Sequence, residues 1–188
     1  MQYIYIPDSV TSIGYGCFEG CTSLNNVDIP PDVSINQLAF NGCVSLSNIT
    51  FKSGNGSTII GNQSFLGCTS LNNVNLPGNV VSIGNSAFQN CTSLSNIKLS
   101  EGLQTIGAES FAGCSSLYYI EIPSSVTSIN YYTFGNGSNS QYGLQTHDVS
   151  VCFPDHTSIP TITGNSTNPG IDVDYKTHYY VPDSLYSS

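Results

Sequence analysis

The chain repeats one pattern of apolar positions along its first two thirds. A leucine is followed by two other residues, an apolar residue, one other residue and a second apolar residue. This triplet occurs at Leu24/Val27/Ile29, Leu46/Ile49/Phe51, Leu71/Val74/Leu76, Leu94/Ile97/Leu99 and Leu117/Ile120/Ile122. The leading leucines lie 22, 25, 23 and 23 residues apart. A unit of that length cannot bury its own apolar face, so neighbouring units must stack.

Isoleucine and phenylalanine form two further columns in the same register. The isoleucines are Ile13, Ile35, Ile60, Ile83, Ile106 and Ile129, and the phenylalanines are Phe18, Phe40, Phe65, Phe88, Phe111 and Phe134. A small residue precedes each phenylalanine, and a cysteine follows the first five of them by three residues. Stacked coils need such recurring shapes to fill a common core at close-packed density. We predict a β-rich solenoid: a right-handed leucine-rich-repeat coil with one parallel β-sheet, short convex strands or turns, and little helix.

The repeats divide the chain into two predicted parts. Residues 1–143 form leucine-rich repeats of about 23 residues, of which the first is truncated, because Tyr3–Pro7 resembles the end of a strand without its leading leucine. We therefore expect the chain to begin inside a repeat of a longer precursor. The third repeat gains two residues near Lys52–Ser57. Residues 144–188 lose the register and are predicted to be a degenerate repeat and C-terminal cap, which a solenoid needs to cover its last apolar coil.

The composition excludes two classes of partner. Only 8% of residues are charged and the formal net charge is −9, with three lysines and no arginine. Nucleic acids and anionic membranes are bound by clusters of Lys and Arg. No apolar run is long enough for a transmembrane helix, which needs about 20 residues. We expect neither nucleic-acid binding nor direct insertion into a membrane.

Seven cysteines would suggest disulfides in a secreted protein, but their spacing predicts otherwise. Five of them occupy one core column: Cys21, Cys43, Cys68, Cys91 and Cys114. Five thiols in a row cannot all pair, and their side chains point the same way. We interpret them as small buried apolar groups with weak S–H donors to a turn carbonyl.

The full motif resembles the BspA-like leucine-rich repeat family. It occurs as Val74-Asn-Leu-Pro77, Val80-Val-Ser-Ile-Gly84, Ala87-Phe88 and Cys91-Thr-Ser-Leu94, and again from Ile120 to Phe134. The resemblance implies a cell-surface or secreted protein of bacterial or protozoan type, with adhesion to host or matrix proteins in some members. The chain departs from the motif in losing the cysteine after Phe134 and the proline after Phe51 and Leu99. We expect these departures to change local turns only.

Alternation along each strand predicts one exposed face, because neighbouring residues of a strand point to opposite sides. Its candidate binding residues are Tyr3, Tyr5, Asn26, Asp28, Asn96, Lys98, Tyr119 and Glu121, and Asn48, Thr50, Asn73 and Asn75 complete the face. One interpretation is a neutral amide ladder that only stabilises the stack. The other is a binding surface whose tyrosines stack on a sugar or grip a peptide, with Tyr118, Tyr131 and Tyr132 as candidates to widen the second cluster.

Catalytic chemistry is not indicated. His147, His156 and Cys152 lie in one segment, but their spacing matches no zinc pattern and no base is placed beside a nucleophile. We predict no enzyme activity, no metal and no cofactor. The expected function is a non-enzymatic extracellular protein-binding or adhesion module that uses the exposed sheet face. A host or matrix protein or a glycan is the expected partner, and the alternative is a structural spacer without a ligand.

Overall fold

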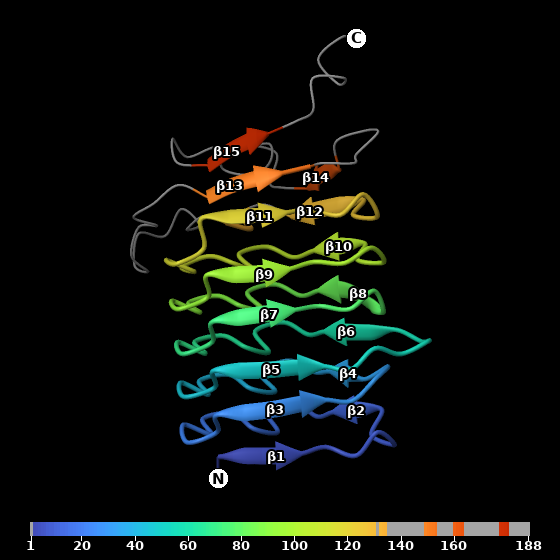
Figure 1. The fold of residues 1–188 in the computed structure, drawn as a ribbon, viewed down its shortest axis with the longest axis vertical. Coiled ribbons are helices and arrows are strands. Elements are labelled where there is room, and N and C mark those ends of the chain that lie inside the picture. Colours follow the sequence, from blue (N-terminus) through green and yellow to red (C-terminus); the bar gives the residue numbers. More distant parts are fainter. Residues whose placement is uncertain (1, 131, 135–148, 154–159, 164–176, 181–188) are drawn as a thin grey trace.

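The computed structural model describes residues 2–130, 132–134, 149–153, 160–163 and 177–180. These residues form a stack of coils without a helix (Figure 1). The strands are β1 (Tyr3–Tyr5), β2 (Ser12–Ile13), β3 (Asn26–Ile29), β4 (Ser34–Ile35), β5 (Asn48–Phe51), β6 (Thr58–Ile60), β7 (Asn73–Asn75), β8 (Val80–Ile83), β9 (Asn96–Lys98), β10 (Thr105–Ile106), β11 (Tyr119–Glu121), β12 (Ser128–Asn130), β13 (Val149–Cys152), β14 (Thr161–Thr163) and β15 (Thr177–Tyr180). We number the coils by their first strands, so that β1 and β2 belong to coil one and β11 and β12 to coil six.

Parallel sheets line two sides of the stack. The odd-numbered strands form a ladder in the order β1-β3-β5-β7-β9 and, separately, β11-β13-β15. The short even-numbered strands form one sheet of seven, in the order β14-β12-β10-β8-β6-β4-β2. The predicted solenoid is confirmed. The short convex strands were expected as local elements, but Ser-Ile or Thr-Ile pairs, and Ile59-Ile60 in β6, fall in register in successive coils and therefore pair into a second continuous sheet.

The predicted core columns all face inward. Phe40, Phe65 and Phe88 are fully buried. Successive rings of the phenylalanine column stack with centroids 5.0–5.7 Å apart and planes within 19° of parallel. Phe18, in coil one, has a neighbouring ring on one side and is only partly buried. The stacking makes the interior of each coil a copy of the next.

The cysteine prediction is confirmed. All seven thiols are free, and four of them donate to the phenylalanine carbonyl of the preceding coil. The Sγ–O distances are 3.1–3.3 Å for Cys43, Cys68, Cys91 and Cys114. Burial raises the pKa of Cys43 to about 11 and that of Cys114 to about 12. These thiols therefore stay protonated and act as donors in the core.

A column of left-handed residues was not predicted. The residue two positions before each phenylalanine has φ between 52° and 61°: Gly16, Leu38, Gln63, Ser86, Glu109 and Tyr132. Only the first is glycine. In coils one to four the N–H of this residue donates to a carbonyl of the next coil, as from Ser86 to Ala108 at 2.7 Å. The stack thus holds side-chain-bearing residues in a conformation that costs roughly 1–2 kcal/mol each.

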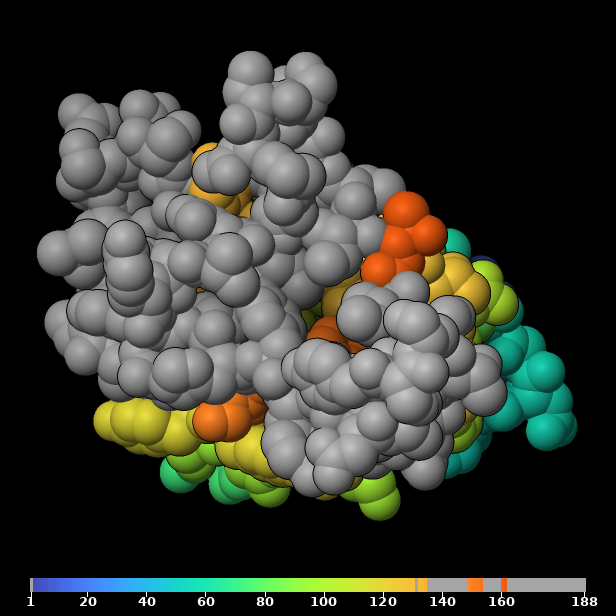
Figure 2. Space-filling view, turned by 90° about the horizontal axis from the view of Figure 1, so that it is seen from above, coloured from blue at the N-terminus to red at the C-terminus, as the bar shows by residue number. Residues whose placement is uncertain are grey.

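The insertion in coil three is built on one carboxylate. Asp32 accepts hydrogen bonds from the Asn55 N–H at 3.2 Å and from Asn79 Nδ2 at 3.1 Å. A Cβ at Gly54 would overlap the Asp32 carboxylate, so the insertion needs glycine there. The insertion, in teal, projects to one side of the stack (Figures 1 and 2).

The predicted cap is described in part. Strands β13, β14 and β15 continue the two ladders beyond coil six (Figure 1). The predicted boundary at residue 143 lies outside the described residues and stays a prediction.

Candidate functional site

The outward residues of the odd-numbered strands β1 to β11 form the face that the sequence predicted. We call it the ladder face: Tyr3, Tyr5, Asn26, Asp28, Asn48, Thr50, Asn73, Asn75, Asn96, Lys98, Tyr119 and Glu121. Asn26 and Asp28 are half-buried and the other ten are exposed. Pairing places Tyr3 beside Asn26, and Asn26, Asn48, Asn73 and Asn96 in one row across the strands. The sheet therefore presents the candidate residues on one surface.

In the row of asparagine side chains, one neighbouring pair is joined by a hydrogen bond. Asn48 Nδ2 donates to Asn26 Oδ1 at 2.9 Å. Within the described ladder face, no such bond joins Asn48 to Asn73 or Asn73 to Asn96. A purely structural amide ladder would bond at every step. The amides of the central coils thus keep donors and acceptors for groups outside the chain.

The tyrosines at the N-terminal end form a charged cluster. Tyr3 donates its hydroxyl to Asp28 Oδ2 at 3.1 Å, which raises the pKa of Tyr3 above its usual value. Lys52 Nζ lies 6.0 Å from the centre of the Tyr5 ring and 2.6 Å from Asp8 Oδ1. Its ammonium is therefore already paired beside the exposed Tyr5 ring.

The second tyrosine cluster lies at the other end of the ladder face. Tyr119 donates its hydroxyl to Glu121 Oε1 at 2.6 Å, and this bond raises the pKa of Tyr119. Five strand-to-strand steps separate β11 from β1, which corresponds to roughly 24 Å at about 4.8 Å per step. The structure thus places the two clusters on one face but does not bring them into one site.

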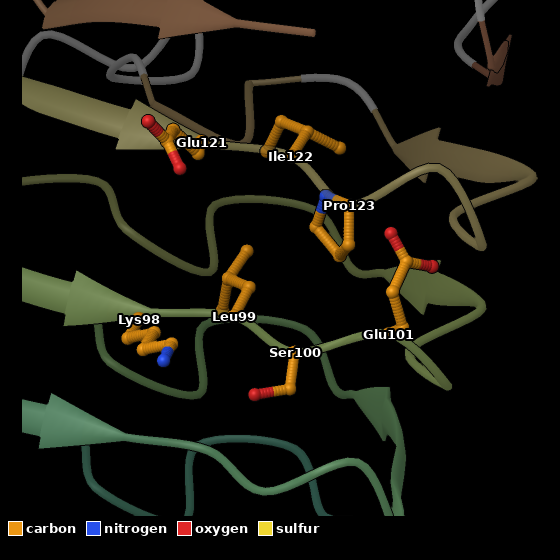
Figure 3. Close-up of a pocket in the computed structure, with 7 residues that line it drawn as sticks. All are labelled: Lys98, Leu99, Ser100, Glu101, Glu121, Ile122 and Pro123. Atoms are coloured by element: carbon orange, nitrogen blue, oxygen red, sulfur yellow. The ribbon is translucent and has the colours of Figure 1, made fainter. Parts of the chain in front are cut away.

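A hollow of about 270 Å³ lies where the ladder is interrupted. It is lined by Lys98, Leu99, Ser100, Glu101, Glu121, Ile122 and Pro123. Figure 3 shows Leu99 and Ile122 between the neighbouring strands, Lys98 and Glu121 at the strand ends, and Glu101 and Pro123 at the turn. Strands β9 and β11 are in contact here but belong to separate sheets. The hollow is a concave feature at the edge of the described ladder face.

Sequence reasoning missed this hollow, although a signal was present. Coils one, two, four and six place a proline directly after the strand, at Pro7, Pro30, Pro77 and Pro123. Coil five has Ser100 there, and Ser100 lines the hollow. The missing proline was expected to alter only the local turn. In coil five its absence coincides with the break in the ladder, whereas coil three, which has Lys52 at this position, keeps β5 paired with β7.

Glu101 ties the two coils together at the edge of the hollow. Its carboxylate accepts hydrogen bonds from the Ser124 N–H at 2.9 Å, the Ser124 hydroxyl at 3.1 Å and the Ser125 N–H at 3.0 Å. Partial desolvation by itself would raise the pKa of Glu101, but these hydrogen bonds outweigh it and lower the pKa. Glu101 is thus ionised, and its hydrogen bonds to Ser124 and Ser125 fix the turn that borders the hollow.

Other chemistry finds little support in the described part of the chain. No three His, Cys, Asp or Glu side chains come together there as metal ligands. No helix in this part is long and apolar enough to cross a membrane. Cys152 is half-buried and free, whereas His147 and His156 lie outside the described residues.

The stacked coils and their repeated motif match a known family. Residues 1–54 and 33–147 match the model described as the BspA type leucine rich repeat region (6 copies). The chain belongs to the BspA-type leucine-rich repeat family. This confirms the resemblance that the motif suggested. No match was found among curated proteins.

Several solved structures resemble this BspA-type chain. A leucine-rich repeat protein from Eubacterium ventriosum is 22% identical with a TM-score of 0.55, over 76% of this chain and 45% of that one. A leucine rich cell surface protein from Faecalibacterium prausnitzii is 24% identical with a TM-score of 0.49, over 99% of this chain and 62% of that one. The T. pallidum leucine-rich repeat protein is 27% identical with a TM-score of 0.46, over 62% and 67%. The chain thus spans less than two thirds of the first two proteins, and the E. ventriosum match supports the fold.

Proposed function

We propose that this BspA-type chain is a non-enzymatic extracellular binding module that contacts its partner through the ladder face. The observation that carries the proposal is the exposed row of amides whose central members do not bond to each other. Asn73 and Asn96 are exposed and lie side by side on β7 and β9. Polar groups left free on a flat, preformed surface favour recognition, because binding them requires little ordering of the chain.

The partner is a host or matrix protein or a glycan at a cell surface, which makes the module an adhesive one. Family resemblance supports the extracellular location. The net charge of −9 and the scarcity of cationic side chains support partners other than nucleic acid. Exposed tyrosines at both ends of the ladder face add side chains of the type that dominates protein interfaces.

One substitution on each face tests the proposal. Asn73→Arg places a long cation at the centre of the ladder face, and Thr105→Arg places the same cation on the opposite sheet; both positions are exposed strand residues. Binding is measured by surface plasmon resonance against purified matrix proteins and by glycan microarray. We expect Asn73→Arg to weaken binding at least about tenfold, as for a residue near the centre of an interface, and Thr105→Arg to leave it unchanged.

The spacer alternative predicts a different result. A spacer binds no member of either panel, and neither substitution has an effect. Binding that Thr105→Arg abolishes and Asn73→Arg spares would contradict the ladder face as the contact surface. Circular dichroism and the melting temperature of each variant establish that the coil stack is intact.

A further inference from the structure

We propose that the hollow between coils five and six binds one neutral hexose unit of a glycan, with the ring of Tyr119 as its stacking platform. This inference rests on the proposed function and names the ligand class for one part of the ladder face. Three features carry it: the mixed charge of the lining, the fixed and exposed tyrosine, and the size of the hollow.

The charges of the lining disfavour an ionic ligand. Lys98 of coil five and Glu121 of coil six lie at the strand ends of the hollow, and Glu101 of coil five lies at its turn (Figure 3). A cationic group would meet the Lys98 ammonium, and an anionic group would meet two carboxylates. Sugar hydroxyls both donate and accept hydrogen bonds, so they suit an ammonium donor and a carboxylate acceptor at the same time.

Two of these charged groups remain available to a ligand. Both carboxylate oxygens of Glu101 are occupied by Ser124 and Ser125. Glu121 uses Oε1 to accept from Tyr119, and within the described residues no hydrogen bond reaches its Oε2. The ion pair found in the described part of the chain joins Lys52 to Asp8 and does not involve Lys98. Lys98 and Glu121 can therefore bond to neighbouring hydroxyls of one ring.

Tyr119 supplies the apolar part of the recognition. It does not line the hollow itself but bonds to Glu121, which does, and its side chain is 51% exposed. The 2.6 Å bond to Glu121 restrains the phenol, so little rotational freedom is lost when a ligand packs on the ring. Aromatic rings with a polar end bind groups that have both apolar and polar sides, as a hexose ring does.

The size of the hollow limits what enters it. Its volume of about 270 Å³ lies below the roughly 300–1,000 Å³ typical of pockets for drug-sized molecules. One sugar ring fits this description, whereas a longer ligand must continue outside. The amide row of Asn96 and Asn73 runs away from the hollow at roughly 4.8 Å per strand. Further units of the same glycan would lie along this row.

A microarray of neutral glucose, galactose and mannose oligosaccharides tests the inference, with sulfated and amino-sugar analogues printed beside them. We expect at least one neutral series to bind, and its charged analogues to bind at least about tenfold more weakly, because each brings one like charge into the hollow. Affinities for the best neutral oligosaccharide are then measured by isothermal titration calorimetry.

Three variants locate the binding. Tyr119→Ala should weaken it about tenfold, the loss expected for one stacked ring, whereas Tyr119→Phe keeps the ring and should stay within about threefold. Ser100→Pro introduces the proline that coils one, two, four and six have, at a position whose N–H donates no described hydrogen bond. The proline ring would lie in the lining of the hollow and should abolish binding. The matched control is Tyr15→Ala, which removes an exposed tyrosine (69% exposed) that lies outside the ladder face, and it should change nothing.

Several results would overturn the inference. They are the absence of binding to every neutral oligosaccharide, tighter binding of the charged analogues, and equal losses for Tyr119→Ala and Tyr15→Ala. If any of these is found while Asn73→Arg still weakens binding to a matrix protein, the ladder face is a binding surface but the hollow is not a hexose site. If Asn73→Arg has no effect on any partner, the proposed function itself fails.

Discussion

The two ends of the ladder face carry the same pair of groups in different surroundings. At the N-terminal end, Tyr3 bonds to a carboxylate on the neighbouring strand, and β1 and β3 are paired without interruption. At the other end, Tyr119 bonds to a carboxylate on its own strand, beside the break between β9 and β11. A tyrosine–carboxylate pair is therefore not sufficient to mark a site; the local packing of the coils decides what lies next to it.

The hollows beside the two pairs also differ. The N-terminal one, of about 380 Å³, is lined by Ile4, Phe18, Cys21 and Leu24 together with the exposed Thr22 and Ser23. The hollow bordered by Glu121 has Lys98 and two carboxylates in its lining. The first hollow therefore exposes apolar groups of coil one, whereas the second, at the break in the ladder, exposes charged groups.

The largest expected effect tests whether the defect reflects loose packing. Phe111 belongs to coil five, is 1% exposed and has stacked rings on both sides. Phe111→Ala should cost about 3–5 kcal/mol of unfolding free energy through the cavity it leaves. Phe18→Ala, at the open end with one ring neighbour, should cost about half of that or less. Urea unfolding of both variants measures the difference. Equal costs would mean that coil five is packed no better than the end of the stack.

A smaller effect of opposite sign is expected at the residue before Phe111. The hydroxyl of Ser110 is buried and has no hydrogen-bond partner, as is that of Ser64 in coil three. An unpaired buried polar group costs about 1–3 kcal/mol. Ser110→Ala should therefore raise the free energy of unfolding by about 1 kcal/mol, because coils two and four already place alanine there, at Ala39 and Ala87. Thr133 is the control, because its hydroxyl donates a hydrogen bond to the Asn130 carbonyl oxygen. Thr133→Val removes this bond and should lower the free energy of unfolding.

The core was predictable from sequence because every core position is repeated. A single phenylalanine does not predict a core column, but six in the same register do, and their rings are stacked in the structure. The left-handed column was not predictable in this way, since Leu38, Ser86 and Glu109 share no residue type that favours positive φ. Backbone bonds between coils impose that conformation, and they exist only after stacking.

The sequence predicted the face of the sheet that carries the candidate residues, but not the position of the hollow on it. Alternation along each strand gave the exposed residues correctly, because that rule is local. The hollow depends on how coil five meets coil six: Ser100 lines it, and β9 and β11 belong to separate sheets beside it. Departures from a repeat are therefore the places at which a repeat protein should be searched for a specific site.

The smallest expected effect compares the two tyrosine–carboxylate pairs directly. Each hydrogen bond favours the neutral phenol and raises its folded-state pKa above the ordinary value of about 10. The stabilisation is therefore fully present below about pH 10 and is lost as the pH rises through the folded-state value. The Tyr119 bond is shorter, 2.6 Å against 3.1 Å, so its loss should be the larger of the two.

Melting temperatures of the wild type, Tyr119→Phe and Tyr3→Phe, measured from about pH 7 upward, test this ordering. The wild type should melt slightly above Tyr119→Phe at neutral pH, by the fraction of a kcal/mol expected of an exposed polar pair, and the gap should close at alkaline pH. The gap for Tyr3→Phe should be smaller throughout. A larger gap for Tyr3→Phe would mean that the N-terminal pair is the better-ordered one, and a restrained ring at Tyr119 could then no longer be invoked as a stacking platform.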